Sequence, residues 1–202
     1  LAPGASRDRL RVASSLHDAV SAAEFVQECT SDEPAEKQPL LAEIDGSTDP
    51  AVPIATCTAD VVISELDGLM RHPERLVVGH PFLPPHILPL VEVVPSARTA
   101  PEVTDWVVQF YEHVGKSVLR LEREVPGLVI SRLQNAILRE ALHMVANGEA
   151  TAQQIDQAVT GGLGIRWAFM GPLKTSFIAQ GADGALHVAL DDDVELLEPA
   201  LL

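Results

Sequence analysis

The chain has 202 residues, of which 47% are hydrophobic and 4% aromatic, and its formal net charge is −15. This length suits one domain or two small ones, and the hydrophobic fraction is too high for a disordered chain. The negative charge, without any cluster of Lys and Arg, argues against nucleic acid as a partner. No apolar run reaches the roughly 18 residues of a membrane span, and the first residues lack a signal-peptide pattern. We therefore expect a cytoplasmic protein without a membrane segment.

The first part of the chain alternates helical and extended patterns. Apolar periodicity and capping residues predict helices at 15–23, 34–44, 61–70 and 102–114. Short apolar or β-branched runs predict strands at 25–26, 52–56, 75–79, 88–94 and 117–121. Alternation of this kind is typical of an α/β fold with a largely parallel sheet.

The pattern becomes purely helical after Pro126-Gly127. Apolar residues at i, i+3 and i+4 predict a long helix over 128–147 and a shorter one over 151–159. The glycine-rich run 161–164 (GGLG) is interpreted as a loop that breaks the second helix. We therefore predict two domains: an α/β domain at 1–126 and an all-helical C-terminal domain at 127–202.

The two cysteines, Cys29 and Cys57, have neither a CxxC spacing nor that of a zinc site. Two cysteines in a chain of this length do not make a disulfide scaffold. We expect two buried thiols and no bound metal.

His80 and Glu92 are the candidate catalytic pair. His80 is expected at the end of a strand, and ligands of α/β folds bind beyond the carboxyl ends of strands. Glu92 follows twelve residues later between Val91 and Val93, and a carboxylate in an apolar strand is uncommon unless it is paired. A carboxylate can orient one nitrogen of a histidine while the other accepts a proton from a substrate hydroxyl. The structural alternative is a surface histidine beside a glutamate on an edge strand.

Four segments resemble the 3-hydroxyacyl-CoA dehydrogenase family in order and spacing: residues 80–84 (HPFLP), 90–93 (LVEV), 126–133 (PGLVISRL) and 170–172 (MGP). The run 162–172 (GLGIRWAFMGP) is most similar to the branch of the family that contains L-gulonate 3-dehydrogenase, lambda-crystallin and the carnitine dehydrogenases. The resemblance extends over about residues 15 to 180.

The resemblance implies the later part of a Rossmann-like NAD-binding domain, followed by a helical domain for substrate binding and dimerisation. It implies NAD as the cofactor, with His80 and Glu92 as general base and partner. It places Asp32 and Lys37 near the cofactor and Ser131 near the substrate. The implied substrate is a small 3-hydroxy acid such as gulonate or carnitine, or a 3-hydroxyacyl-CoA. Homodimers through the long helix are also implied.

Several features depart from the family pattern. The family usually has Asn at Leu83, Ser at Ala59 and Asn at Ser131. No G-x-G-x-x-G between a strand and a helix occurs in these residues, so we expect a chain that is incomplete at its front and binds NAD poorly by itself. The acidic tail from 183 to 202 does not align with the family. A non-catalytic homologue or a structural, crystallin-like protein is therefore the alternative function.

Overall fold

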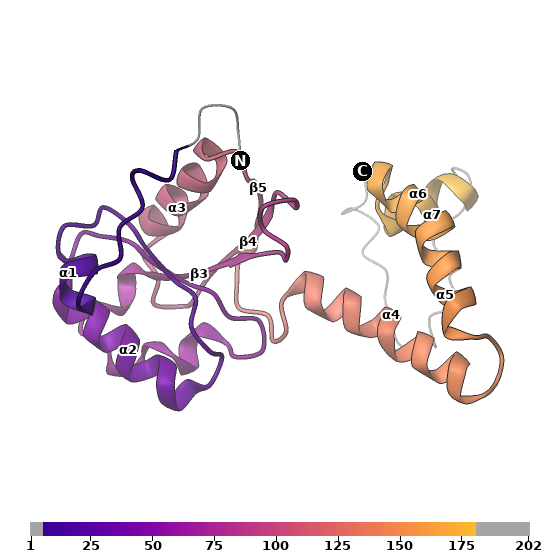
Figure 1. Ribbon diagram of the computed structural model, residues 1–202, viewed down its shortest axis with the longest axis horizontal. Helices are drawn as coiled ribbons and strands as arrows, with labels where there is room; N and C mark the ends of the chain where they lie inside the picture. The colour runs from indigo at the N-terminus through magenta and orange to yellow at the C-terminus, as the bar shows by residue number, and fades with distance from the viewer. Residues whose placement is uncertain (1–5, 181–202) are drawn as a thin grey trace. The chain divides into compact units, whose positions relative to one another are not determined.

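The computed structural model describes residues 6–180 (Figure 1). The chain divides into two compact units, the first ending at Gln134 and the second beginning at Asn135. The sequence-based boundary at 126/127 lies a few residues earlier, at the turn that precedes the long helix.

The first unit is built on a five-stranded sheet whose strands follow one another in chain order. The strands are β1 (Val26–Glu28), β2 (Ile54–Thr56), β3 (Leu76–Pro81), β4 (Leu90–Pro95) and β5 (Ser117–Arg120). β1, β2 and β3 are parallel, whereas β4 runs antiparallel to β3 and parallel to β5. All five predicted strands are present, and the expected α/β class is confirmed with one antiparallel junction.

Helices cover both faces of this sheet (Figure 1). α1 (Leu16–Val20) and α2 (Pro34–Ser47) pack on one face, where Ile54, Val78 and Val94 join their core. α3 (Pro101–His113) packs on the other face against Ala55, Val77 and Val93. Side chains alternate between the two faces along each strand, so both faces of the central strands are apolar, as buried parallel strands require.

The helix predicted at 61–70 is wrong. Two short 3-10 segments, Ile63–Glu65 and Asp67–Leu69, stand in this region instead, and a third, Pro73–Arg75, follows it. Gly68 and Pro73 disfavour a continuous α-helix. The buried Asp67 also accepts two hydrogen bonds from Arg98, far along the chain, which local periodicity cannot indicate.

From Val129 to residue 180 the regular elements of the chain are all helices. The elements are α4 (Val129–Ala146), α5 (Ala152–Ala158), α6 (Gly164–Phe169) and α7 (Pro172–Gln180). Thr151 and Gln154 form a reciprocal capping box at the start of α5. The glycine run 161–164 is not a loop, because residues 159–163 form a π-helical turn that leads into α6. The region after residue 180, with the acidic tail, lies outside the described residues.

The helices and the two cysteines can be compared with the predictions from sequence. Among residues 6–180, no helix is long and apolar enough to cross a membrane. Cys29 is exposed and Cys57 is only partly buried, so the prediction of two buried thiols is wrong. Cys29 directly follows β1, which is an edge strand of the sheet that the described residues form.

Candidate active site

The pairing of β3 with β4 places His80 directly opposite Glu92. In an antiparallel pair, opposite residues point to the same face. His80 Nδ1 lies 3.2 Å from Glu92 Oε2. The His80 side chain is 14% exposed, whereas the Glu92 side chain is fully buried. The two residues thus form a contact in which only the imidazole can reach a ligand.

The first turn of α4 holds the Glu92 carboxylate from its other side. Glu92 Oε1 accepts hydrogen bonds from the backbone N–H of Val129, at 2.9 Å, and of Ile130, at 3.1 Å. These amides belong to the first turn of α4, where N–H groups have no partner within the helix. A negative charge is favoured at such an end, and three hydrogen bonds to the carboxylate fix its orientation.

An unusual backbone conformation positions these amides. Gly127 and Leu128 have positive φ angles of 75° and 50°, so two successive residues lie in the left-handed region. Glycine adopts it freely, but for a leucine it costs on the order of 1–2 kcal/mol. The Leu128 side chain is buried in the core beneath the sheet, which compensates for this strain. Sequence reasoning missed this turn, because backbone amides leave no signature in residue types beyond Pro126-Gly127.

The predicted cofactor residues Asp32 and Lys37 lie near each other but in different environments. Lys37 is buried, and its Nζ donates to Glu28 Oε2 at 2.7 Å and to the carbonyl of Cys57 at 3.0 Å. Asp32 has a side chain that is 39% exposed, and its Oδ1 lies 3.9 Å from Lys37 Nζ. The Asp32 carboxylate can therefore contact a ligand. The Lys37 ammonium group is buried, so it can affect a ligand only through the residues that it contacts.

Glu28 is a further residue of this cluster that the sequence analysis did not single out. Burial alone would raise its pKa, but hydrogen bonds from Lys37, Thr30 and Thr56 outweigh burial and hold the pKa below its ordinary value. A glutamate at a strand end with a lysine nine residues later was a weak signal for this pair. The pair fixes the carboxyl ends of β1 and β2, the edge at which dinucleotides bind in folds of this type.

Three positions depart from the family pattern: Ala59 precedes His80 in the sequence, Leu83 lies between His80 and Glu92, and Ser131 follows Glu92. Leu83 is 73% exposed in the loop after β3, and Ala59 is partly buried after β2. Neither side chain can form a hydrogen bond. Ser131 lies in the first turn of α4, next to the amides that hold Glu92, and is partly exposed.

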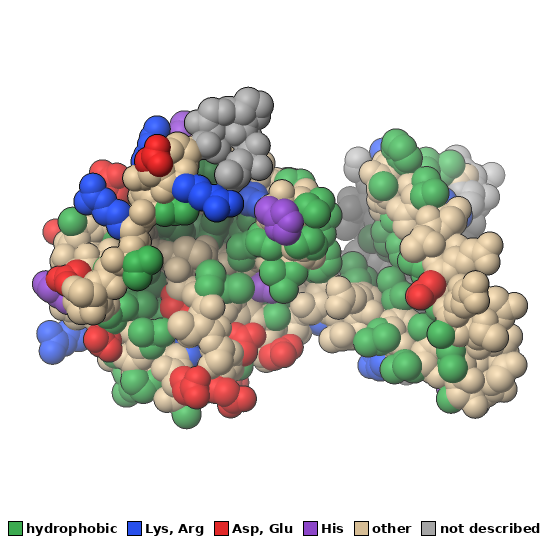
Figure 2. Space-filling model, in the orientation of Figure 1, with side chains coloured by type: hydrophobic (Ala, Val, Ile, Leu, Met, Phe, Trp, Pro, Cys, Tyr) green, Lys and Arg blue, Asp and Glu red, His purple; other side chains and the backbone are tan. Residues whose placement is uncertain are grey.

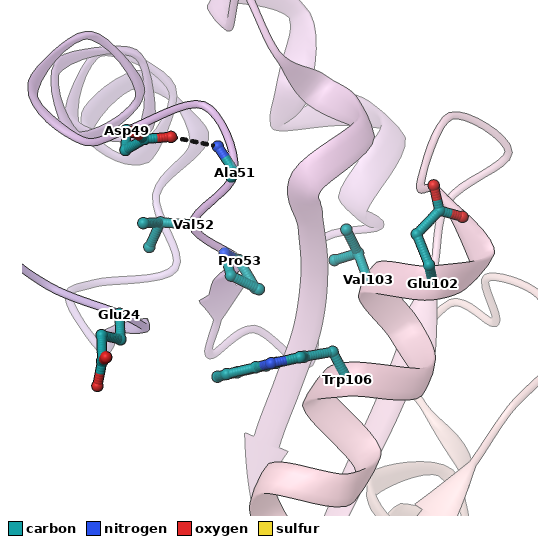
Figure 3. Close-up of a pocket in the computed structure, with 8 residues that line it drawn as sticks. All are labelled: Glu24, Asp49, Ala51, Val52, Pro53, Glu102, Val103 and Trp106. Carbon is teal, nitrogen blue, oxygen red and sulfur yellow. Dashed lines mark hydrogen bonds between the residues drawn. The ribbon is translucent and has the colours of Figure 1, made fainter.

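A separate pocket of about 620 Å³ lies between the loop before β2 and the first half of α3 (Figure 3). Trp106 extends from α3 towards Pro53 and Glu24 and forms one wall. Pro53 precedes β2, so this pocket lies at the amino ends of the parallel strands, whereas His80 lies near the end of β3. It is therefore distinct from the His80–Glu92 site.

Comparison with protein families gives a direct assignment. Residues 3–125 match the family model described as 3-hydroxyacyl-CoA dehydrogenase, NAD binding domain, and residues 127–192 match the C-terminal domain. The chain belongs to the 3-hydroxyacyl-CoA dehydrogenase family. The expected fold and cofactor class agree with this family.

Individual relatives agree with the family assignment. The chain is 50% identical over 188 residues to an L-carnitine dehydrogenase of Streptomyces griseus, an alignment that covers 93% of this chain and 56% of the relative. It is 43% identical to an L-carnitine dehydrogenase of Pseudomonas aeruginosa, covering 93% of this chain and 58% of that relative. The chain thus spans a little over half the length of the curated relatives it matches.

Solved structures share the fold. One is 5-formyl-3-hydroxy-2-methylpyridine 4-carboxylic acid 5-dehydrogenase, an NAD+-dependent dismutase, with a TM-score of 0.78, 31% identity, and coverage of 82% of this chain and 53% of that chain. Another is the 3-hydroxyacyl-CoA dehydrogenase of Archaeoglobus fulgidus, with a TM-score of 0.70, 26% identity, and coverage of 79% and 54%.

Proposed function

We propose that this chain provides the catalytic pair of an NAD-dependent dehydrogenase that oxidises the 3-hydroxyl group of a small, carnitine-like hydroxy acid. The observation that supports this most directly is the buried Glu92 carboxylate, held by two backbone amides and in contact with the imidazole of His80. This arrangement suits proton abstraction from an alcohol.

His80 is the proposed general base. With its Nδ1 facing Glu92, the other ring nitrogen, Nε2, is the one that can accept the hydroxyl proton of a substrate. The Glu92 carboxylate orients the ring and stabilises the imidazolium that results. Because the backbone amides of Val129 and Ile130 also hold this carboxylate, the ring keeps its position when the proton moves.

The proposed cofactor is NAD, which supplies the hydride acceptor when it is bound. The exposed carboxylate of Asp32 fits the hydroxyl groups of a ribose, which are hydrogen-bond donors. Lys37 is buried and does not fit as a direct ligand, so we assign it to holding Glu28 and the end of β2 in place. Ser131 is the proposed polar contact for the substrate.

A small acid is favoured over an acyl-CoA, because the relatives at 50% identity are L-carnitine dehydrogenases.

The test is NADH formation from L-carnitine by the chain in its natural length, with His80→Gln and Glu92→Gln as variants. We expect each variant to lower turnover by roughly 10²–10⁴-fold, the usual contribution of a general base. His113→Gln is the matched control, because His113 is exposed at the end of α3, and we expect it to retain the wild-type rate. Equal activity in the wild type and in His80→Gln would contradict the proposed role.

A non-catalytic homologue is the second candidate, because Leu83 and Ala59 replace polar residues of the family pattern. If the wild type binds NAD but forms no NADH from L-carnitine, gulonate or a 3-hydroxyacyl-CoA, this candidate replaces the first. The double variant Leu83→Asn, Ala59→Ser then indicates the origin of the loss. A gain of turnover in this variant would assign the loss to these two positions.

A further inference from the structure

We propose that Cys29 and Cys57 form an oxidisable dithiol, a site at which the folded chain can make a reversible disulfide between the ends of β1 and β2. Neither cysteine has a role in the proposed dehydrogenase mechanism. The two residues lie far apart in sequence, and the sheet brings them together.

The strand register places the two cysteines on neighbouring strands at the same level of the sheet. Glu28 pairs with Thr56 in the parallel ladder, so the next residues, Cys29 and Cys57, are opposite one another. The ladder continues at this point, because the Cys57 N–H donates to the carbonyl of Glu28 at 2.8 Å. Neighbouring strands lie about 4.7–4.9 Å apart, and disulfides join Cα atoms about 4.4–6.8 Å apart.

Side-chain alternation places both thiols on the same face. Thr56 Oγ1 donates to Glu28 Oε2, so these two side chains share the face of α2. Cys29 and Cys57 must then point to the opposite face, that of α3. Two contacts of α3 support this placement: Tyr111 donates to the side chain of Gln27, two residues before Cys29, and packs in one core cluster with Ala55, two residues before Cys57.

The two thiols differ in their accessibility and acidity. Burial and then the Glu28 carboxylate raise the pKa of Cys29 above its ordinary value. Cys29 is exposed, so an oxidant can reach the pair from solvent. Because burial raises the pKa of Cys57 to about 11, thiolate is scarce at neutral pH and exchange is slow, which suits a thermodynamic modification site rather than a fast sensor.

The reaction uses a low-molecular-weight disulfide, such as glutathione disulfide, as oxidant. One protein thiolate attacks it, releases one glutathione thiol and leaves a mixed disulfide. The second protein thiolate then displaces the other glutathione, so two protein thiols lose two electrons and two protons, and one glutathione disulfide becomes two glutathiones.

The test is equilibration of the native chain with glutathione redox buffers under mildly alkaline conditions, followed by acid quenching and mass spectrometry. We expect a monomer that has lost two hydrogen atoms and both titratable thiols, with a Cys29–Cys57 peptide link after proteolysis. Cys29→Ser and Cys57→Ser are matched controls that retain one thiol each, so they can form a glutathione adduct or an intermolecular disulfide but no disulfide within the chain.

A second expectation concerns the redox midpoint at which the disulfide closes. The native chain should close the disulfide in a more reducing buffer than the same chain unfolded in denaturant, because the sheet holds the thiols side by side. Glutathione adducts or intermolecular disulfides as the only products of the native chain would overturn the proposal. An equal midpoint in native and unfolded chains would overturn it as well.

Discussion

The smallest residue near the site, Gly79, decides how closely β3 can approach α3. A Cβ at this position would collide with the hydroxyl of Tyr111 and lie 2.9 Å from the Cβ of Ala55. Tyr111 cannot easily withdraw, because its hydroxyl donates to Gln27, whose amide in turn donates to the carbonyl of Gly79 at 3.2 Å. Gly79 immediately precedes His80, so crowding here also displaces the candidate base.

We therefore expect Gly79→Ala to lower the free energy of unfolding by about 1–3 kcal/mol, the usual cost of overpacking. Urea unfolding followed by circular dichroism measures this change. Gly46→Ala in α2 is the control, because a Cβ there meets no atom within 4 Å and alanine favours helix, so this variant should be as stable as the wild type or more so. Equal stability of both variants would show that Tyr111 can move aside.

At the scale of residues, the sequence predicted the candidate catalytic side chains but not the contacts that hold them or their neighbours. His80 and Glu92 could be paired in advance, because a glutamate between valines needs a partner and a histidine was expected at the end of a preceding strand. The amides of Val129 and Ile130 could not be predicted, since any residue types could supply them. The buried position of Lys37 was also missed, because its partner Glu28 stands on another element.

Among the elements, a buried ion pair joins α2 to the start of β3. Arg75 donates from Nε and Nη2 to Asp45 Oδ1, at 2.9 and 2.7 Å. Burial alone would raise the pKa of Asp45, but the hydrogen bonds from Arg75 and from the N–H groups of Arg71 and His72 hold it below the ordinary 3.8. The folded state thus binds the Asp45 proton more weakly than the unfolded state does.

This pair predicts how stability depends on pH. A lowered pKa stabilises the fold above the ordinary pKa, and this contribution disappears as pH falls through the folded-state value. Glu28, whose pKa is also lowered, acts in the same direction. We expect the wild-type free energy of unfolding to decrease as pH falls below about 4, with a smaller decrease in Asp45→Asn.

At neutral pH, Asp45→Asn should cost about 3–5 kcal/mol, because it leaves Arg75 buried without its charge partner. Asp105→Asn is the matched control: its pair with Arg120 is exposed, so the change should be below about 1 kcal/mol. Urea titrations of the three proteins at several pH values measure both effects. Parallel pH profiles for the wild type and Asp45→Asn would contradict this assignment.

The elements that could be predicted are those with a local signal in the sequence. The five strands and the helices α3, α4 and α5 appeared near their expected positions because of their apolar patterns, and α2 was indicated by Pro34 in its first turn. The region 61–75 did not, because its 3-10 segments depend on Gly68, Pro73 and the distant contact of Asp67 with Arg98. The antiparallel direction of β4 was likewise not considered in advance.

At the scale of the whole molecule, α4 has two apolar stripes. Ile137, Ala141 and Met144 line a groove of about 440 Å³ between α4 and α5. Leu138, Leu142 and Val145 form the second stripe, and they are 52%, 60% and 41% exposed. Among residues 6–180, no residue of α4 is buried. Figure 2 shows hydrophobic side chains at the surface of this part of the molecule.

We propose that a second copy of the chain covers this second stripe, because a monomeric protein rarely exposes a contiguous apolar stripe of this kind. Sedimentation equilibrium at tens of micromolar should then give twice the chain mass of 21.6 kDa. Leu142→Glu places a charge in the stripe and should shift the equilibrium to monomer. Leu69→Glu, at an exposed leucine of the first unit, is the control and should remain dimeric. A wild type that sediments as a monomer without aggregation would contradict the proposed dimer.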